Sequence, residues 1–269
     1  MAAPSPASAP VLDEPAGKRR WPRILLAAAA VLVVAGSVAA IVKLTGRDGA
    51  TQTPLSAGPA SSAAAASPTP STCGFTDGFD GNAVAAAWRR TRTDTALTVA
   101  GGTVTMAAPD GSDIYETYVD APRLLRPATG NFVMRADLTA RPHQFYQGAG
   151  LVLWAGADHY ARVERGYGQY GEVVFEYKNG AKHKRVLKPG SGPARADADR
   201  VVLELSRQGS AVRARWRLAT ETAWRDLGSV TMTLPAGVQL GVSVLNRAQG
   251  TKAKPEPFSA SFDSVALTC

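Results

Sequence analysis

Cysteine and histidine, the usual ligands of zinc, are scarce in this sequence. It contains two cysteines and three histidines, and His143, His159 and His183 lie far apart with no His-Glu-x-x-His spacing. A zinc site needs more ligands close together. The sequence also lacks a Gly-x-Ser-x-Gly nucleophile motif and a glycine-rich phosphate loop ahead of a helix. These absences argue against a metal site and against serine-hydrolase or phosphate-binding chemistry.

Large apolar side chains are scarce in the first 72 residues, with one exception. Residues 1–17 and 45–72 are mostly Ala, Ser, Thr, Pro and Gly, so neither segment can bury enough surface to offset the entropy of ordering. Between them, Ile24 to Val42 are nineteen residues without a charge, which is enough for a membrane-spanning helix. The sequence predicts a disordered tail at 1–23, a transmembrane helix at 24–42, a linker at 43–72 and one domain at 73–269.

The charges beside the apolar run predict its orientation. Four basic residues precede the run and two follow it closely: Lys18, Arg19, Arg20, Arg23, Lys43 and Arg47. The positive-inside rule then places the tail in the cytoplasm and the domain on the extracytoplasmic side of the cell membrane, with the helix as a signal anchor. The alternative is a signal peptide cleaved near Ser37-Val38-Ala39, where small residues have suitable spacing. Both alternatives export the domain.

Cysteine usage agrees with export. Cys73 and Cys269 are the first and last residues of the predicted domain. One disulfide that joins the two ends of the domain is the expected arrangement in an oxidising compartment, and two free thiols are the alternative.

The charge of the domain is mildly positive. Six of the 30 basic and three of the 22 acidic residues precede Cys73, which leaves 24 basic and 19 acidic residues and a net charge of +5. That balance permits contact with anionic polymers of the cell envelope. Nucleic acid is not an expected partner, because an exported domain seldom meets it.

Several segments alternate apolar and polar residues with the period of half-buried strands. Residues 201–218 are typical of a hairpin with an apolar face and an arginine face, and residues 132–138 and 238–244 alternate in the same way. Turn residues predict further hairpins at Gly101-Gly102 and at Asn179-Gly180. Ten or more short strands with almost no helix indicate an all-β sandwich of two antiparallel sheets.

The stretch QFYQGAGLVLWAGADHYARVERG, residues 144–166, holds the most distinctive pattern. Its apolar run, Gly150 to Trp154, predicts a central strand that is covered on both faces. Tyr160 to Glu164 would be its partner, with one face exposed to water that carries Tyr160, Arg162 and Glu164.

Several blocks of the sequence resemble a known superfamily. The segments CGFTDGFDG, QGAGLVLW, DHYARVERG and FSASFDSVAL occur in the order seen in the concanavalin A-like lectin/glucanase superfamily. More narrowly, they are similar to its branch related to the C-terminal domain of bacterial β-xylosidases, over essentially all of residues 74–267. The resemblance implies a jelly-roll sandwich with a concave face that is often used on glycans. It does not imply an activity, because fold alone does not settle function.

Catalytic carboxylates are not evident. Retaining glucanases on this fold carry two glutamates flanking an aspartate on one strand, with the carboxylates about 5 Å apart. Glu172 and Glu176 come nearest here, but four residues of strand separate them by roughly 13 Å, and no aspartate lies between them. A pair from different strands, such as Glu164 with Glu172, stays open. We therefore expect no enzyme activity, with a cryptic glycoside hydrolase as the less favoured alternative.

A binding site is more strongly indicated. Tyr167 and Tyr170 lie in a glycine-rich turn, where their rings can stack on the C–H faces of sugars. Polar side chains for the sugar hydroxyls would come from neighbouring strands: Gln147, Tyr160, Arg162, Glu164 and Arg135. The alternative is that Tyr160 packs under a loop while Arg162 and Glu164 pair across strands. Four tryptophans are expected in the core: Trp88, Trp154, Trp216 and Trp224.

The sequence thus predicts a membrane-anchored, non-catalytic carbohydrate-binding module whose partner is a glycan or envelope polysaccharide. A structural or adhesion module that binds protein or anionic envelope polymers is the alternative. No cofactor is expected. The alternative is a structural calcium ion near Asp77, Asp80 and Asp263, because such domains often hold one where their ends meet.

Overall fold

Strands make up nearly all of the regular structure in the computed structural model, which describes residues 74–166, 171–186, 194–247 and 254–269. In chain order they are β1 (Phe75–Asp77), β2 (Arg89–Arg90), β3 (Leu97–Ala100), β4 (Thr103–Ala108), β5 (Ile114–Tyr115), β6 (Tyr118–Val119), β7 (Arg123–Thr129), β8 (Phe132–Ala140), β9 (Gln147–Gly156), β10 (His159–Gly166), β11 (Glu172–Asn179), β12 (Lys182–Arg185), β13 (Ala194–Arg195), β14 (Arg200–Gln208), β15 (Ala211–Leu218), β16 (Arg225–Thr231), β17 (Gly237–Asn246) and β18 (Phe258–Thr268). None of the described residues belongs to a helix of membrane-spanning length and apolarity. The predicted tail, transmembrane helix and linker lie outside the described residues.

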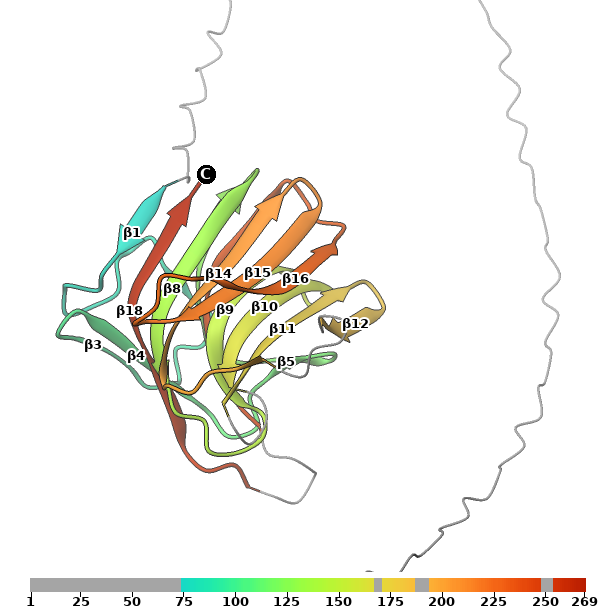
Figure 1. Ribbon diagram of the computed structural model, residues 1–269. Coiled ribbons are helices and arrows are strands. Elements are labelled where there is room, and N and C mark those ends of the chain that lie inside the picture. The colour runs from blue at the N-terminus through green and yellow to red at the C-terminus, as the bar shows by residue number, and fades with distance from the viewer. Residues whose placement is uncertain (1–73, 167–170, 187–193, 248–253) are drawn as a thin grey trace, which may run out of the picture. The chain divides into compact units, whose positions relative to one another are not determined.

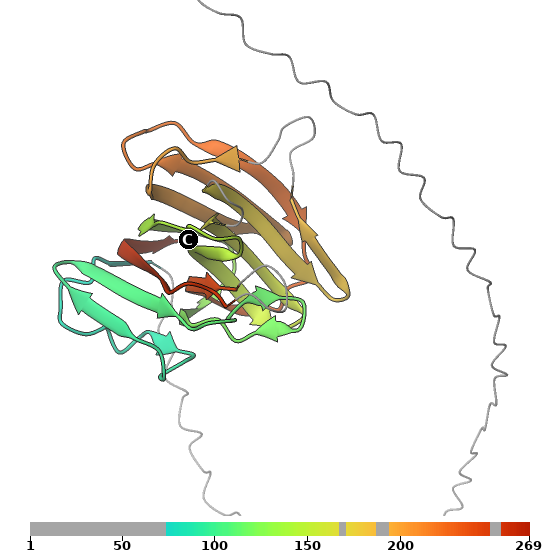
Figure 2. The same cartoon turned by 90° about the horizontal axis from the view of Figure 1, so that it is seen from below.

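Two antiparallel sheets stack face to face (Figures 1 and 2). The first sheet has the order β16-β15-β14-β8-β18-β4-β3, with β1 also paired to β18. The second has the order β12-β11-β10-β9-β17-β7-β2, with β13 also paired to β11. The prediction of an all-β two-sheet antiparallel sandwich is confirmed.

The main core lies between the two sheets and follows the period-two pattern of the sequence. On β14 and β15, Leu203, Leu205 and Trp216 point into it, and on β10 Ala161 and Val163 do so. Because side chains alternate along a strand, the intervening residues must point to the outer faces. The predicted hairpins β14–β15, β3–β4 and β11–β12 are all present.

The strand β9 is central in the second sheet and buried along most of its length, as predicted. Its neighbours approach it closely. A Cβ atom on Gly150 would lie 1.9 Å from the Val163 carbonyl oxygen, and one on Gly241 of β17 would lie 1.7 Å from that of Leu124. Both positions therefore require glycine, because any larger residue would push the neighbouring strand away.

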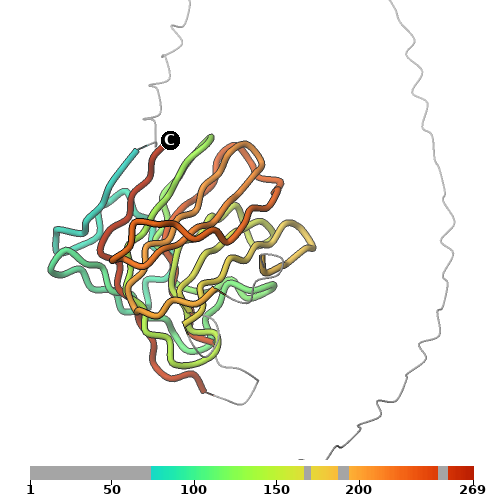
Figure 3. Tube along the Cα trace, viewed as in Figure 1, coloured from blue at the N-terminus to red at the C-terminus, as the bar shows by residue number. Residues whose placement is uncertain are grey.

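The two ends of the domain lie side by side (Figure 3). Strand β1 pairs with the last strand, β18, so that Phe75 lies opposite Leu267 and Asp77 opposite Val265. The first and last strands are neighbours, as the sequence predicts for this sandwich.

Candidate functional site

Residues 109–122, which include the small hairpin of β5 and β6, cover the outer face of the second sheet; we call them the cover segment. Its β5 strand lies beside β11 and β12 (Figure 1). A second apolar cluster is buried between this segment and the sheet. It contains Ile114, Ala121, Leu125, Val152, Tyr160 and Leu245, with Trp154 packed against it. The apolar residues between the outer face and the cover segment therefore form a second, smaller core.

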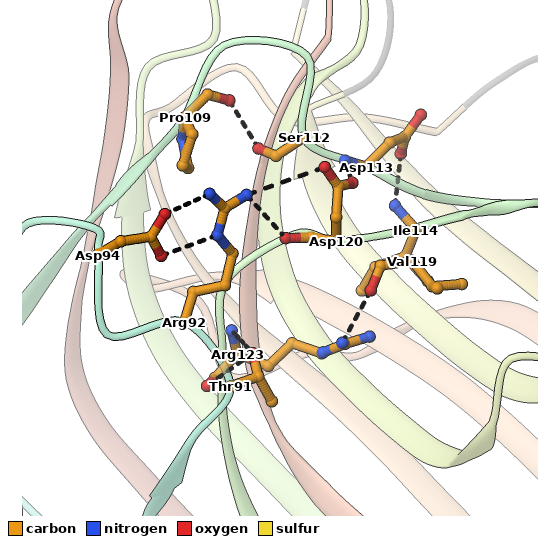
Figure 4. Close-up of polar contacts among 10 residues, drawn as sticks. All are labelled: Thr91, Arg92, Asp94, Pro109, Ser112, Asp113, Ile114, Val119, Asp120 and Arg123. Atoms are coloured by element: carbon orange, nitrogen blue, oxygen red, sulfur yellow. Dashed lines mark hydrogen bonds and ion pairs between the residues drawn. The ribbon is translucent and has the colours of Figure 1, made fainter.

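Polar contacts at the base of the cover segment hold it in place (Figure 4). Arg92 is paired with Asp94 and donates a hydrogen bond to the Asp120 carbonyl oxygen at 3.3 Å. Arg123 donates to the Val119 carbonyl oxygen at 2.9 Å. A backbone bridge between Ser112 and Asn246 fixes the segment to β17.

Further contacts hold the tip. The Glu116 backbone N–H donates to the Tyr160 hydroxyl at 3.2 Å, and Lys178 donates to the Glu116 carbonyl oxygen at 2.9 Å. Glu116 has a φ of 51°, a left-handed conformation that costs energy for a residue with a side chain. The contacts to Tyr160 and Lys178 compensate for that conformation at the turn of the hairpin.

The cover segment overturns the expectation that one face of β10 is exposed to water. Tyr160, Arg162 and Glu164 do point away from the main core, but they are 0%, 2% and 1% exposed. Tyr160 packs under the segment, and Arg162 lies opposite Glu176 across the β10–β11 pair. Sequence pattern alone identifies the outward face of a strand but not what lies on top of it.

Arg162 is the centre of a buried ion cluster. Its guanidinium lies 2.5 Å from Glu176 Oε2, 3.3 Å from Glu164 Oε1 and 3.4 Å from Asp113 Oδ1. Asp113 belongs to the cover segment and the two glutamates to the sheet, so Arg162 links one to the other. Burial alone would lower the pKa of Arg162, and the three carboxylates raise it well above its usual value.

Three carboxylates on one cation carry excess negative charge when all are ionised. Burial raises the pKa of Glu164 to about 7, with further raising by Glu176 and Asp113 against the lowering effect of Arg162. Burial also raises the pKa of Asp113 and lowers that of His183. His183 Nε2 lies 3.7 Å from Glu176 but makes no hydrogen bond, so the neutral imidazole is the better description. The cluster takes up a proton near neutral pH.

A second arginine lies under the other end of the cover segment. Arg123 stacks 4.1 Å over the Trp154 ring, and burial, with help from Arg89, lowers its pKa to about 10. Among the described residues, no hydrogen-bond partner is found for its buried Nε and Nη1 or for the Oγ of Ser243, which lies opposite Arg123 on β17. This end of the outer face is polar but closed.

The remaining predicted site residues do not form one group. Gln147 is fully buried on β9. Its Oε1 accepts hydrogen bonds from the backbone N–H groups of His143 and Gln144, and its Nε2 donates one to Asn246 Oδ1. Arg135 lies on β8 in the first sheet, so the prediction that it neighbours β10 is wrong. Tyr167, Tyr170 and Cys73 lie outside the described residues. Ligand contact by any of these residues stays a prediction.

The tryptophans divide between the core and the outer faces. Trp88 and Trp216 are 6% and 3% exposed and belong to the main core, as predicted. Trp154 and Trp224 are half-buried, and the prediction that they are core residues is wrong. Trp154 borders the covered face, and Trp224 lies among arginines of the first sheet.

Two of the three carboxylates considered for calcium bind groups of the protein itself. Asp77 accepts hydrogen bonds from the Phe79 backbone and the Trp88 indole, and Asp263 accepts one from Thr103 and pairs with Arg200. The described part of the chain contains no group of three His, Cys, Asp or Glu residues that is suited to a metal ion. The predicted calcium ligands are therefore not assembled there.

Nor do the glutamates form an accessible catalytic pair. Glu164 and Glu176 share Arg162 and are both almost fully buried, while Glu172 pairs with Arg185 at 2.8 Å. A glycosidase needs two carboxylates open to the substrate. Glu164 and Glu176 instead bind Arg162, which also contacts Asp113 of the cover segment.

An open groove of about 640 Å³ runs beside the tip of the cover segment. Its lining comes from that tip and from two hairpin turns: Glu116, Thr117, Asp158, His159, Lys178, Gly180, Ala181 and His183. Lys178 and Asp158 form an ion pair at 2.9 Å across it, and this pair lowers the pKa of Asp158. Hydrogen-bond donors and acceptors thus both line an accessible hollow.

Exposed aromatic rings gather around the cover segment. The exposed large apolar side chains of the described chain are Tyr115, Tyr118 and Phe145. Tyr115 packs edge-on against His183 of the groove at 4.5 Å, and Arg247 stacks over Tyr118 at 3.4 Å. The sequence shows Tyr115 and Tyr118 close together, but only the fold places Tyr115 beside His183 and Tyr118 beside Arg247, so this grouping has no local sequence signal.

The two-sheet antiparallel sandwich is the architecture of concanavalin A-like domains. The model of the family described as "Beta xylosidase C-terminal Concanavalin A-like domain" matches residues 76–242, more than half of the chain. The chain belongs to this family, and the matched region corresponds to the non-catalytic C-terminal domain of such enzymes. The resemblance inferred from the sequence is confirmed.

Solved structures share the fold at low sequence identity. A functionally unknown protein from Saccharomyces cerevisiae is 13% identical with a TM-score of 0.55, over 68% of this chain and 96% of that chain. A xylan beta-1,4-xylosidase from Bacillus halodurans is 14% identical with a TM-score of 0.59, over 78% of this chain and only 41% of its own. The GH43 BlXynB protein from Bacillus licheniformis is 13% identical with a TM-score of 0.57, over 72% and 39%. No curated protein matches the sequence significantly.

Proposed function

We propose that this protein is a non-catalytic carbohydrate-binding module and that the open groove beside the cover segment holds the glycan. The observation that carries the proposal is the combination of an accessible hollow with charged and polar groups from three separate turns. Sugar hydroxyls need several convergent donors and acceptors, which Asp158, His159 and Lys178 supply. The family supports a binding role, since concanavalin A-like domains are associated with carbohydrates in general.

The exposed tyrosines of the cover segment suit the same ligand. Aromatic rings pack against the C–H faces of sugars while their hydroxyls stay in water. Tyr115 is 36% and Tyr118 is 45% exposed, and Tyr115 adjoins the groove through His183. A glycan chain in the groove can therefore extend over the outer side of the cover segment.

We also propose that the domain is exported and held at the cell membrane by residues 24–42, with residues 43–72 as the linker. The support is the uncharged run of nineteen residues and the excess of basic residues before it. A glycan-binding domain on the outside of a cell meets its ligand there.

A disulfide between Cys73 and Cys269 is part of this proposal. Phe75 of β1 lies opposite Leu267 of β18, so the first described strand of the domain pairs with its last strand. Cys269 carries no free thiol. Both observations support a bond that joins the two ends of the domain.

A glycan array tests the function directly. Purified full-length protein is applied to neutral and acidic glycans, and we expect a signal that a matching free oligosaccharide removes by competition. An array without any competable signal contradicts the proposal.

A further inference from the structure

On the outer face of the first sheet, three arginines surround a single tryptophan. The guanidinium carbons of Arg135, Arg215 and Arg217 lie 5.6, 5.2 and 5.3 Å from the centre of the Trp224 ring. Arg135 belongs to β8 and the other two to β15, and β14 lies between these strands. The indole therefore lies above β14, with cations on both sides. Each distance is within the range of a cation–π contact.

Positive charge is in excess around this ring. Arg135 and Arg215 share one carboxylate, that of Glu204, at 2.8 and 2.5 Å. Glu204 is 2% exposed, so it is hidden from any ligand. Arg217 donates hydrogen bonds to the backbone carbonyls of Leu218, Ala219 and Glu221. Three cations with one buried carboxylate leave a local charge of about +2.

The neighbouring arginines of the same face do not add to the excess. Arg213 pairs with Asp226 and Arg200 with Asp137. Arg225 lies opposite Trp216 and stacks on its ring, so it belongs to the other face of the sheet, and it pairs with Glu221. The surplus is thus confined to the group around Trp224. The Arg135 side chain is 48% and the Arg215 side chain is 30% exposed, so both can reach a ligand without any change in the fold.

We propose that Arg135, Arg215, Arg217 and Trp224 bind a carboxylate-bearing polysaccharide. A guanidinium recognises a carboxylate by charge-assisted hydrogen bonds, and the half-buried indole offers an apolar surface for the C–H groups of a sugar ring. An acidic sugar carries both groups, whereas a phosphate chain without sugar rings has nothing to place on the indole. This surface lies on the opposite sheet from the groove, so the two sites are independent.

Binding of full-length protein to a polygalacturonate oligomer tests the proposal. Arg135→Gln is the main variant, because Arg215 still pairs with Glu204 after the change. We expect affinity to fall about tenfold, the loss of one hydrogen bond between charged groups. Arg217→Gln is the second variant and should also weaken binding, while the melting temperature of each variant reports whether its fold is kept.

Arg213→Gln is the matched control. It removes the same charge from the same face of β15, at a side chain 51% exposed and paired with Asp226. We expect the affinity of Arg213→Gln for polygalacturonate to differ less than twofold from that of the wild type. Three results overturn the proposal: no binding to polygalacturonate, an equal loss in Arg213→Gln, or equally tight binding of inorganic polyphosphate or of a neutral polysaccharide of the same length. Asp158→Asn in the groove should leave polygalacturonate binding to this surface unchanged, so failure here is distinguishable from failure of the groove.

Discussion

At the scale of single residues, Arg162 and its three carboxylates dominate the electrostatics of the covered face. Glu164 gains its raised pKa mainly from burial, so the folded protein holds this proton more tightly than the unfolded chain does. A group with a raised folded pKa contributes stability that is complete below its unfolded pKa and is lost as the pH rises through its folded pKa. For Glu164 that window extends from about pH 4.5 to about pH 7. The domain should therefore be most stable in mild acid.

The free energy of unfolding should fall by up to about 3 kcal/mol between pH 5 and pH 8 because of Glu164. In Glu164→Gln this part of the pH dependence should vanish, since glutamine resembles the protonated acid at every pH. Urea denaturation at a series of pH values measures the effect, with Glu256→Gln at an exposed position as the control. If the free energy of unfolding of Glu164→Gln still falls as steeply with pH as that of the wild type, another group binds the proton.

At the scale of elements, the cover segment decides which sheet face is open. Its anchor in the second core is Ile114, which is fully buried, while its tip is held by the hydrogen bonds to Tyr160 and Lys178. Ile114→Ala should cost about 3 kcal/mol locally, since it removes buried methyl groups and leaves a cavity. Hydrogen exchange should show faster exchange of the Ile114–Val119 amides with β8 and β18 unchanged. Equally faster exchange everywhere would mean that the segment and sandwich unfold as one unit.

The same element marks the limit of sequence-based prediction. Hairpins such as β14–β15 and β3–β4 were predictable because alternation and turn residues are local signals. The covering of Tyr160 and Arg162 was not, because Asp113 and Ile114 precede them by almost fifty residues and Ile114 begins a strand of only two residues. Arg135 was misplaced for a related reason: alternation shows which face a residue occupies within its own strand but not which sheet the strand joins.

At the scale of the whole molecule, the pairing of β1 with β18 brings the two ends of the domain together. A bond between Cys73 and Cys269 closes a very long loop, and the chain-entropy model gives about 4 to 5 kcal/mol of stabilisation for it. Cys269→Ala should therefore lower the melting temperature clearly, and a reductant should lower that of the wild type to a similar value. Two reactive thiols in the native protein would contradict the proposed disulfide.

The proposed orientation in the membrane also concerns the whole molecule. Because four basic residues precede the apolar run, the domain should lie outside the cell. Protease added to intact cells should remove the domain, while untreated protein should sediment with the membranes. Recovery of a soluble mature form beginning near Ala40 would instead support a cleaved signal peptide.

Titration calorimetry of full-length protein with the glycan that gives the strongest array signal tests the central claim most directly. Asp158→Asn keeps the shape of an exposed groove residue but removes its charge, and Asp199→Asn does the same at a paired carboxylate elsewhere. If the glycan binds in the groove, its affinity should be about tenfold weaker in Asp158→Asn, while the melting temperature of that variant stays unchanged. The affinity of Asp199→Asn should equal that of the wild type. Equal affinity of all three proteins would show that the glycan does not bind in this groove.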